Sequence, residues 1–242
     1  MARFYVGYEL KGRERAEIEG GDVHHIRDVL RLKVGDGLIL WDASGMQYRG
    51  RISAIERRRV VVEIEGELAP LPKEWINVTL AQALLKAGKM ELIIQKATEL
   101  GVSSIIPFTC GRTIPRLSGK VARWGRVAYE ASKQCGRASI PEVGEVLTFD
   151  QLMNLPGSFD IKLLLWEEEK LGLKEVLRVY PQIKAILLVV GPEGGFAREE
   201  VEVAKERGFI PVSLGPRILR SETVPLTLMS ILQFEYGDLG ET

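Results

Sequence analysis

The chain has 242 residues, 45% of them hydrophobic, which is enough to bury a core in one large domain or in two smaller ones. Its 33 Lys and Arg balance its 33 Asp and Glu, and this zero net charge argues against a strong non-specific nucleic-acid binder. The first residues hold too few apolar side chains for a secretory signal, and no stretch approaches about 18 uninterrupted apolar residues, so we expect a cytoplasmic protein with no membrane role. The cysteines, Cys110 and Cys135, have no neighbouring Cys or His, and we predict neither a disulfide framework nor a metal site.

Short strands dominate the first part of the chain. Alternating and β-branched runs bounded by turn residues predict strands at 3–8, 37–42, 46–56 and 59–66. Between the first two strands, DVHHIRDVLRL predicts a short helix with Asp22 as its N-cap. Two prolines in LAPLP, residues 68–72, favour extended backbone without ladder hydrogen bonds and indicate a linker. We therefore predict a small, mostly β domain at residues 1–70.

The pattern changes after this linker to strands that alternate with helices. This alternation is typical of an α/β domain with a largely parallel sheet, which we assign to residues 73–242. Helices are predicted at 89–101, 197–207 and 225–236, and strands at 76–85, 103–110, 161–167, 185–191 and 210–215.

Charge is distributed unevenly along the chain. Residues 1–72 hold 12 basic and 12 acidic residues, residues 73–140 hold 11 basic and 4 acidic, and residues 141–242 hold 10 basic and 17 acidic. The middle segment is therefore positive and the last one negative, which suggests a localised anionic partner.

The stretch VVGPEGGFAREE places three glycines, a proline and a carboxylate between a buried strand and a helix. Glycines there let backbone N–H groups and a helix N-terminus approach a ligand closely, which makes a phosphate or nucleotide site possible. The spacing matches neither nucleotide-binding fingerprint, and Glu193 would repel a phosphate. A tight turn that only redirects the chain is the structural alternative.

A second strand-end loop, SLGPRILRSET, strengthens the ligand hypothesis. Neighbouring strand ends at the carboxyl edge of an open parallel sheet form ligand sites, so the two loops can line one pocket. Backbone amides, apolar walls and a carboxylate suit a neutral or cationic adenosine-bearing ligand better than a polyphosphate.

These motifs resemble the ribosomal RNA small subunit methyltransferase E family, the uridine-N3 methyltransferases of the SPOUT superfamily. GPEGGF followed by SLGPRILRSET carries the resemblance, with HHIRDVLRLKVGD, QALLKAGKMELIIQKATELGV, RTIPR and KQCGRASIPEV in support. The resemblance implies an α/β fold: a SPOUT-type domain with a C-terminal trefoil knot, preceded by a small PUA-like β-barrel. It also implies a homodimer that binds S-adenosylmethionine and methylates 16S ribosomal RNA, either naked or in the assembled small subunit.

Site residues follow from the resemblance position by position. It implies that the cofactor pocket is formed by Leu165, Trp166, Glu167, Gly191, Pro192, Glu193, Gly194, Gly195, Leu214, Gly215, Ile218, Leu219 and Arg220. Methylation at N3 removes a proton and spreads negative charge onto the uracil oxygens, for which we predict Arg220 as the cation, Glu222 as the proton acceptor and Arg112 as a second arginine. A local Arg220–Glu222 ion pair that only holds the loop is the alternative.

A basic helical face is the predicted RNA contact. In GKVARWGRVAYEASKQCGR, residues 119–137, the cations Arg123, Arg126, Lys133 and Arg137 share one side of a predicted helix. Arg57, Arg58 and Arg59, at a predicted hairpin turn, form a second candidate for phosphate contact. Two other readings stay open: a non-catalytic RNA-binding protein whose glycine loops are structural, and a SPOUT methyltransferase that acts on another RNA.

Overall fold

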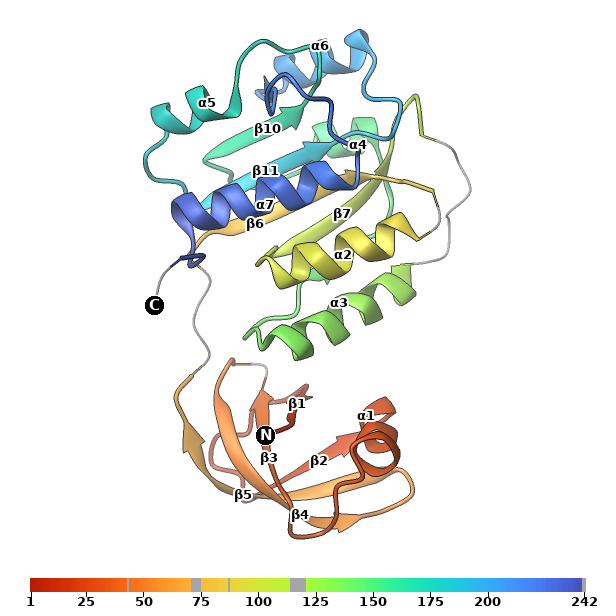
Figure 1. Cartoon of the computed structure of the whole chain (residues 1–242), viewed down its shortest axis with the longest axis vertical. Helices are drawn as coiled ribbons and strands as arrows, with labels where there is room; N and C mark the ends of the chain where they lie inside the picture. Colours follow the sequence, from red (N-terminus) through yellow and green to blue (C-terminus); the bar gives the residue numbers. More distant parts are fainter. Residues whose placement is uncertain (43, 71–74, 87, 114–120, 241–242) are drawn as a thin grey trace. The chain divides into compact units, whose positions relative to one another are not determined.

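The chain folds into two compact units (Figure 1). The computed structural model describes residues 1–42, 44–70, 75–86, 88–113 and 121–240. The N-terminal unit comprises Met1–Lys73 and Ser132–Ser139, and the C-terminal unit comprises Glu74–Ala131 and Ile140–Thr242. Of the predicted linker at 68–72, Leu68 ends a strand and positions 71–72 lie outside the described residues.

A five-stranded sheet that curls into a half-barrel forms the N-terminal unit (Figure 1). Its strands are, in sheet order, β1 (Arg3–Val6), β3 (Gly37–Asp42), β4 (Gln47–Ile55), β5 (Arg59–Leu68) and β2 (Arg15–Glu19). β1 runs parallel to β3, and the other neighbours are antiparallel. Alternate side chains such as Phe4, Val6, Val60 and Val62 enter the core, as the period of a half-buried strand requires.

The helix after β2 differs from the sequence-based expectation. Gly20, with φ of 70°, precedes α1 (Gly21–His24), which continues into the π-helical turn η1 (His25–Val29). The prediction of Asp22 as the N-cap is therefore wrong. Its carboxylate is buried and pairs with Lys133, so a long-range charge pair has replaced the local capping bond. β2 was not predicted, because RAEIE offers only two apolar residues.

A parallel sheet forms the centre of the C-terminal unit. It is built from β6 (Asn77–Ala83), β7 (Ser104–Thr109), β8 (Glu142–Val143), β9 (Leu147–Thr148), β10 (Ile161–Leu165), β11 (Ala185–Val190) and β12 (Ile210–Val212). The order is β12-β10-β11-β6-β7-β8, and β9 pairs with β7. Parallel pairing throughout confirms the α/β prediction.

Both faces of this sheet are covered by helices, so its strands are apolar on both sides. Val78 and Leu80 of β6 pack in the core with side chains of α2 (Lys89–Glu99), α3 (Val121–Cys135), α5 (Leu173–Val179) and α7 (Thr223–Tyr236). Ala81 and Ala83 of the same strand face α4 (Phe149–Met153) and α6 (Arg198–Glu206). Across the described ranges, every helix is too short or too polar to cross a lipid bilayer.

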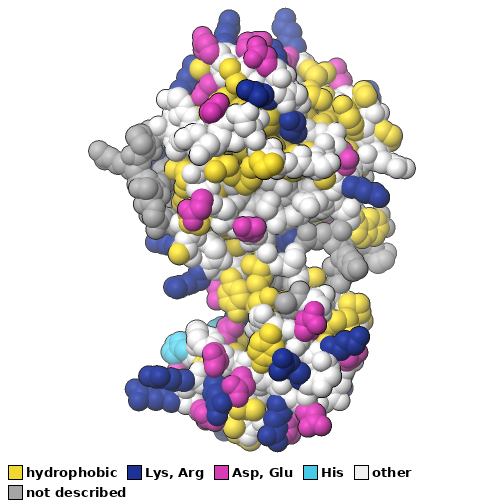
Figure 2. Space-filling view, turned by 180° about the vertical axis from the view of Figure 1, so that it is seen from behind, with side chains coloured by type: hydrophobic (Ala, Val, Ile, Leu, Met, Phe, Trp, Pro, Cys, Tyr) yellow, Lys and Arg dark blue, Asp and Glu magenta, His cyan; other side chains and the backbone are white. Residues whose placement is uncertain are grey.

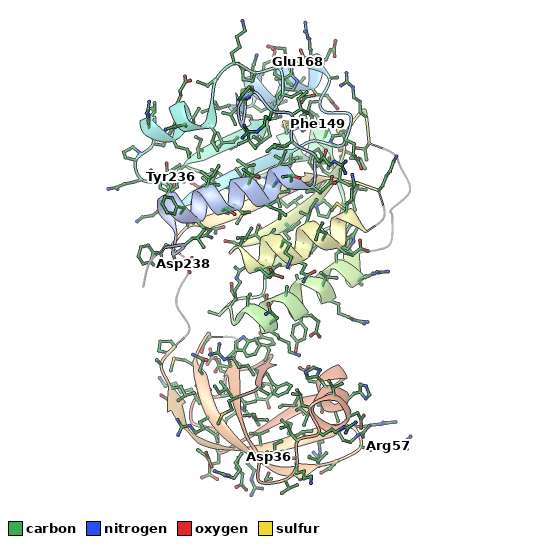
Figure 3. The ribbon with its side chains drawn as sticks, viewed as in Figure 1. Asp36, Arg57, Phe149, Glu168, Tyr236 and Asp238 are labelled. Atoms are coloured by element: carbon green, nitrogen blue, oxygen red, sulfur yellow. The ribbon has the colours of Figure 1, made fainter. Side chains whose placement is uncertain are left out.

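One tyrosine anchors the C-terminal end of α7 to α5. Tyr236, labelled in Figure 3, donates from its hydroxyl to the carbonyl oxygens of Leu177 and Tyr180, at 3.2 and 2.8 Å. α7 begins at Thr223, two residues before the predicted start, with Pro225 in its first turn, where proline is tolerated.

Candidate active site

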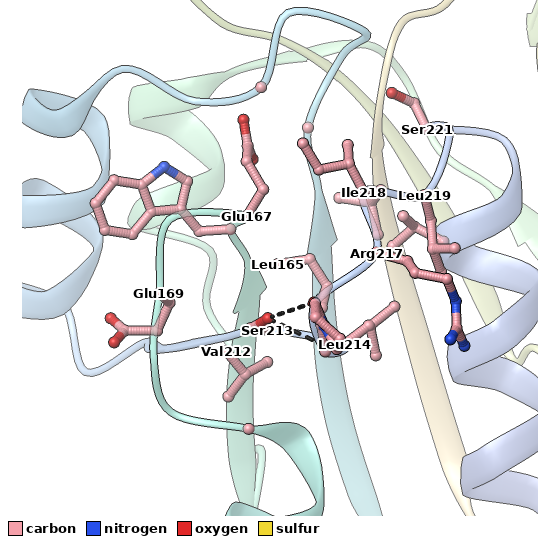
Figure 4. A pocket seen from close by; sticks show the side chains of 18 of the residues that line it. Leu165, Glu167, Glu169, Val212, Ser213, Leu214, Arg217, Ile218, Leu219 and Ser221 are labelled. Atoms are coloured by element: carbon pink, nitrogen blue, oxygen red, sulfur yellow. Dashed lines mark hydrogen bonds between the residues drawn. The ribbon is translucent and has the colours of Figure 1, made fainter.

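A cavity of about 470 Å³ opens at the carboxyl ends of β10, β11 and β12 (Figure 4). The last residues of these strands, Leu165, Val190 and Val212, form part of its wall. Carboxyl ends of adjacent parallel strands meet at one edge of a sheet, and the loops that leave them surround a common space. The volume falls in the range of about 300–1,000 Å³ that small-molecule sites occupy.

Most of the predicted cofactor-binding residues lie around this cavity. They are Leu165, Trp166, Glu167, Gly191, Pro192, Glu193, Gly195, Leu214, Gly215, Ile218 and Leu219. Gly194 and Arg220, also predicted, are outside the lining. The sequence-based prediction missed Glu169, Lys170, Gly172, Val190, Val212, Ser213, Pro216, Arg217, Ser221 and Val224. Some of them, such as Ser213, Arg217 and Val190, lie within the quoted motifs and the others lie near them, and no spacing in the sequence distinguishes them.

The wall combines apolar surface with an excess of carboxylates. Figure 4 shows Glu167 on one side of the opening and Ile218 and Leu219 on the other. Ile218 is 84% exposed, an unusual state for an isoleucine beside a cavity. The charged residues of the wall are Glu167, Glu169, Glu193, Lys170 and Arg217. Within the part of the chain that the structure describes, no three His, Cys, Asp or Glu side chains gather in a way that could hold a metal ion.

Tight packing explains the glycines that follow β11. Gly195 has φ of 66°, and a Cβ there would lie 2.4 Å from Glu167 Oε1. A Cβ on Gly191 would lie 3.0 Å from the ring of Phe196. A Cβ at Gly195 would displace the Glu167 carboxylate, and a Cβ at Gly191 would require the Phe196 ring to shift by a few tenths of an ångström. At Gly195 the positive φ also disfavours a side chain. The loop is therefore a tight turn that also lines the cavity, and its role in ligand binding stays a prediction.

Backbone hydrogen bonds connect the segment after β10 to the segment after β12. Trp166 N donates to Val212 O at 3.0 Å, Leu173 N donates to Ser213 O at 3.0 Å, and Ser213 N donates to Leu171 O at 2.9 Å. Gly215 N then donates to Ser213 Oγ at 3.1 Å, with Gly215 at φ of 111°. Main-chain hydrogen bonds thus hold together two wall segments of the cavity that are about 40 residues apart in the sequence.

The two predicted catalytic residues after β12 differ strongly in environment. The Arg220 side chain is 84% exposed and lies 4.0 Å from Glu222, at the outer limit of an ion pair. Glu222 is only 16% exposed, and its Oε2 lies 2.9 Å from Lys89 Nζ. The Lys89 ammonium holds the pKa of Glu222 below its usual range, although partial burial opposes this shift. The Arg220–Glu222 pair of the alternative hypothesis is thus present, but Lys89 is the closer cation.

Lys89 was not predicted as a site residue. It follows Gly88, the N-cap residue of α2, which has a φ of 87°. Its Nζ also lies 3.2 Å from Glu193 Oε1. It belongs to the KMELIIQK stretch, but Glu193 is 104 positions away, so only the tertiary structure reveals the contact.

The third predicted catalytic residue, Arg112, lies in the loop after β7. Its Nη1 donates to Gly194 O at 2.7 Å, and Gly111 N donates to Glu200 Oε1 at 2.8 Å. Arg112 thus braces the glycine loop of its own chain from outside the cavity. The rest of the RTIPR motif, 114–116, lies outside the described residues.

The predicted basic face of α3 divides into two parts. Arg123 is 68% exposed, with Glu91 at 3.4 Å, and Arg126 is also exposed. Lys133 is different: its side chain is 10% exposed and pairs with Asp22, whose side chain is 8% exposed. The expectation of an open Lys133 is wrong, because the end of α3 packs within the N-terminal unit and the charge needs a buried partner. Arg137 is half-buried.

The second predicted basic cluster lies at the hairpin turn between β4 and β5. Arg57 and Arg58 are exposed, and Figure 3 shows Arg57 pointing outward. Arg59 contacts Glu56 at 2.9 Å and Glu17 at 2.8 Å. Its charge is therefore compensated, whereas the two residues at the turn project into solvent.

Two family models match separate parts of the chain. An RNA methyltransferase domain model matches residues 72–233, and an RNA methyltransferase PUA domain model matches residues 18–65. Ribosomal RNA small subunit methyltransferase E of Bacillus subtilis is 34% identical over 251 residues, with 97% of each chain covered.

Two solved methyltransferase structures match this chain over nearly its full length. That of a ribosomal RNA small subunit methyltransferase E from Neisseria gonorrhoeae bound to S-adenosyl methionine is 32% identical, with a TM-score of 0.90 over 98% of this chain and 99% of that one. A putative methyltransferase from Legionella pneumophila in complex with the cofactor SAM is 32% identical, with a TM-score of 0.88 over 98% of each chain. The chain therefore belongs to the ribosomal RNA small subunit methyltransferase E family.

Proposed function

We propose that this protein transfers the methyl group of S-adenosylmethionine to N3 of a uridine in the 16S ribosomal RNA of the small ribosomal subunit. The observation that carries the proposal is the cavity at the ends of β10, β11 and β12, lined by the two glycine loops that sequence reasoning had singled out. Its relatives of known structure include two with the cofactor bound.

The residues around the cavity fit this cofactor. Bound there, S-adenosylmethionine supplies an electrophilic methyl group on a positively charged sulfonium. Glu167, Glu169 and Glu193 outnumber the cations of the wall and favour a cationic ligand. Leu214, Ile218 and Leu219 offer apolar surface for the faces of an adenine, and the glycines let main-chain groups reach its edge. Ile218 would lose its solvent exposure in this arrangement.

The chemistry at the base needs alignment and charge stabilisation. Uracil N3 must lose a proton, and negative charge develops on O2 and O4. Arg220 is free to extend toward these oxygens because its side chain is 84% exposed. Glu222 is the proton acceptor in this proposal: it is ionised at neutral pH, although the Lys89 ammonium that lowers its pKa also makes it a weaker base. Arg112 supports the site through Gly194 and is the second candidate cation.

Access to N3 requires an unpaired or flipped base, because N3 lies on the Watson–Crick edge. Arg123 and Arg126 on α3, with Arg57 and Arg58 at the hairpin, are the proposed phosphate contacts; Arg137 is a weaker candidate. Figure 2 shows basic side chains interspersed with acidic ones on the visible face of both units, which favours discrete contacts over a broad basic coat. The substrate is 16S ribosomal RNA, naked or in the assembled small subunit, in the cytoplasm.

The proposal includes a homodimer and a trefoil knot. α7 exposes apolar side chains, Ile231 at 36% and Phe234 at 71%, and a second copy covering them would remove this surface from water. The knot is what the resemblance to the SPOUT fold implies; the main-chain bonds between Leu171 and Ser213 place the segments after β10 and β12 side by side. Sedimentation equilibrium of wild type and Phe234→Asp tests the dimer, which the aspartate should weaken.

The experiment for the activity is nucleoside mass spectrometry of small ribosomal subunits that lack the modification, after incubation with the protein and S-adenosylmethionine. Appearance of N3-methyluridine establishes reaction, cofactor and base together. Its absence with cofactor binding intact keeps the pocket and points to another RNA. Absence of both favours a non-catalytic RNA-binding protein.

A further inference from the structure

One ammonium group lies between the two loops that border the cavity. Lys89 Nζ is 3.2 Å from Glu193 Oε1, in the loop after β11, and 2.9 Å from Glu222 Oε2, in the loop after β12. Its side chain is 32% exposed, against 34% for Glu193 and 16% for Glu222. Neither carboxylate comes from the helix that carries the lysine, so the contacts join three separate segments.

Local helix energetics do not explain a lysine at this position. Lys89 is the first residue of α2, where the partial positive charge of a helix N-terminus disfavours a cation. A residue that conflicts with its local preference indicates a tertiary requirement. Here the requirement is met by two carboxylates, which are themselves favourable near a helix N-terminus.

The carboxylates would repel each other without this lysine. Both lie within 3.2 Å of one nitrogen, so the two contacting oxygens are at most about 6 Å apart. Arg220 is the other cation that faces Glu222, but at 4.0 Å and 84% exposure it is screened by water. The backbone amide of Lys86 also faces Glu193 and carries no net charge to replace the ammonium.

We propose that Lys89 is a positioning residue: it ties the loop after β11 to the loop after β12 and so holds the cavity in its ligand-ready shape. Glu193 lines the cavity and Glu222 adjoins it, so a change in their separation alters the wall directly. The role goes beyond the proposed function, on which it depends only for the identity of the ligand.

The test compares Lys89→Gln, Lys89→Arg and Lys89→Gln combined with Glu193→Gln. Lys96→Gln is the matched control, because Lys96 is on the same helix and pairs locally with Glu99 at 2.9 Å. Titration calorimetry with S-adenosylhomocysteine gives the affinity. Hydrogen exchange without ligand reports on residues 191–195 and 213–222, with β7 as the internal reference.

We expect Lys89→Gln to weaken binding by at least about fivefold and to speed exchange in both loops but not in β7, since it leaves two like charges unbridged. Lys89→Arg should bind within about twofold of wild type, because a guanidinium can bridge two carboxylates. The double variant should restore slow exchange in both loops, because one of the repelling charges is gone; exchange without ligand is its readout, since Glu193 itself lines the cavity.

Wild-type affinity and exchange in Lys89→Gln would overturn the proposal, as would an arginine variant no better than glutamine. Failure of wild type to bind S-adenosylhomocysteine would instead contradict the proposed function, and the exchange data would still decide the role of Lys89.

Discussion

Gly215 offers a direct test of the cofactor pocket, because only its backbone conformation, and no neighbouring atom, disfavours a side chain at this position. Its φ is 111°, and a methyl group placed there would meet no atom within 4 Å. Gly215→Ala therefore adds no clash. It adds only the strain of a conformation that L-residues rarely adopt, about 1–3 kcal/mol.

The loop can relieve this strain by rearranging when no ligand is bound. Binding must then restore the original conformation, and the dissociation constant for S-adenosylhomocysteine should rise by about 5- to 150-fold. Calorimetric titration measures it directly. Gly208→Ala is the matched control, since Gly208 has φ of 78° and lies after α6, outside the cavity lining. It should lower thermal stability without changing affinity.

Unchanged affinity in folded Gly215→Ala would refute the reasoning, and so would an equal loss of affinity in Gly208→Ala. The first result would mean that the loop after β12 does not need its native conformation for binding. The second would mean that general destabilisation, and not the geometry of the pocket, controls affinity.

Four further outcomes are expected. Arg220→Ala should lower single-turnover methylation by at least about tenfold with unchanged cofactor affinity, and full activity would remove this residue from the mechanism. The pair Arg123→Ala and Arg126→Ala should weaken RNA binding and flatten its salt dependence, by about one unit of slope per residue; an unaltered slope would assign this face to solvent. Because the pKa of Glu222 is lowered, its ionised form stabilises the fold above about pH 4.3 and this contribution is lost as pH falls through the lower folded value. In urea unfolding, the difference in unfolding free energy between wild type and Glu222→Gln should thus stay constant from about pH 5 to 8 and shrink below about pH 4. A change of this difference near neutral pH would contradict the assignment. Lys133→Met should cost about 3 kcal/mol of unfolding free energy in the same assay, because it removes the cation that pairs with the buried Asp22 carboxylate; a loss below about 1 kcal/mol would mean that the pair is dispensable.

Sequence periodicity was sufficient for most elements of the fold. Long apolar runs such as AILLVV and the 3,4-spaced apolar face of α2 are local properties, and strands and helices appear where they predicted them. The short helices α4 and α5 and the strand β2 were missed, because segments of five to seven residues contain too few turns or alternations to show a period.

The candidate site likewise has features that the sequence reveals and features that it does not. The glycines after β11 and β12 are visible in the sequence because only a special backbone conformation or a close approach explains them, as at Gly195. The spatial neighbours of charged side chains cannot be identified from the sequence. Lys133 was expected in solvent and is buried with Asp22, while Lys89 bridges two loops more than 100 residues away.

The sequence alone therefore determined the α/β class of the part after the N-terminal strands and the loops that line the cavity, because each depends on the order and chemistry of nearby residues. Only the tertiary structure decided which strand ends meet, which carboxylate has a lowered pKa and which cation lies beside it. Those outcomes depend on distances between residues far apart in the chain, and no local pattern encodes a distance.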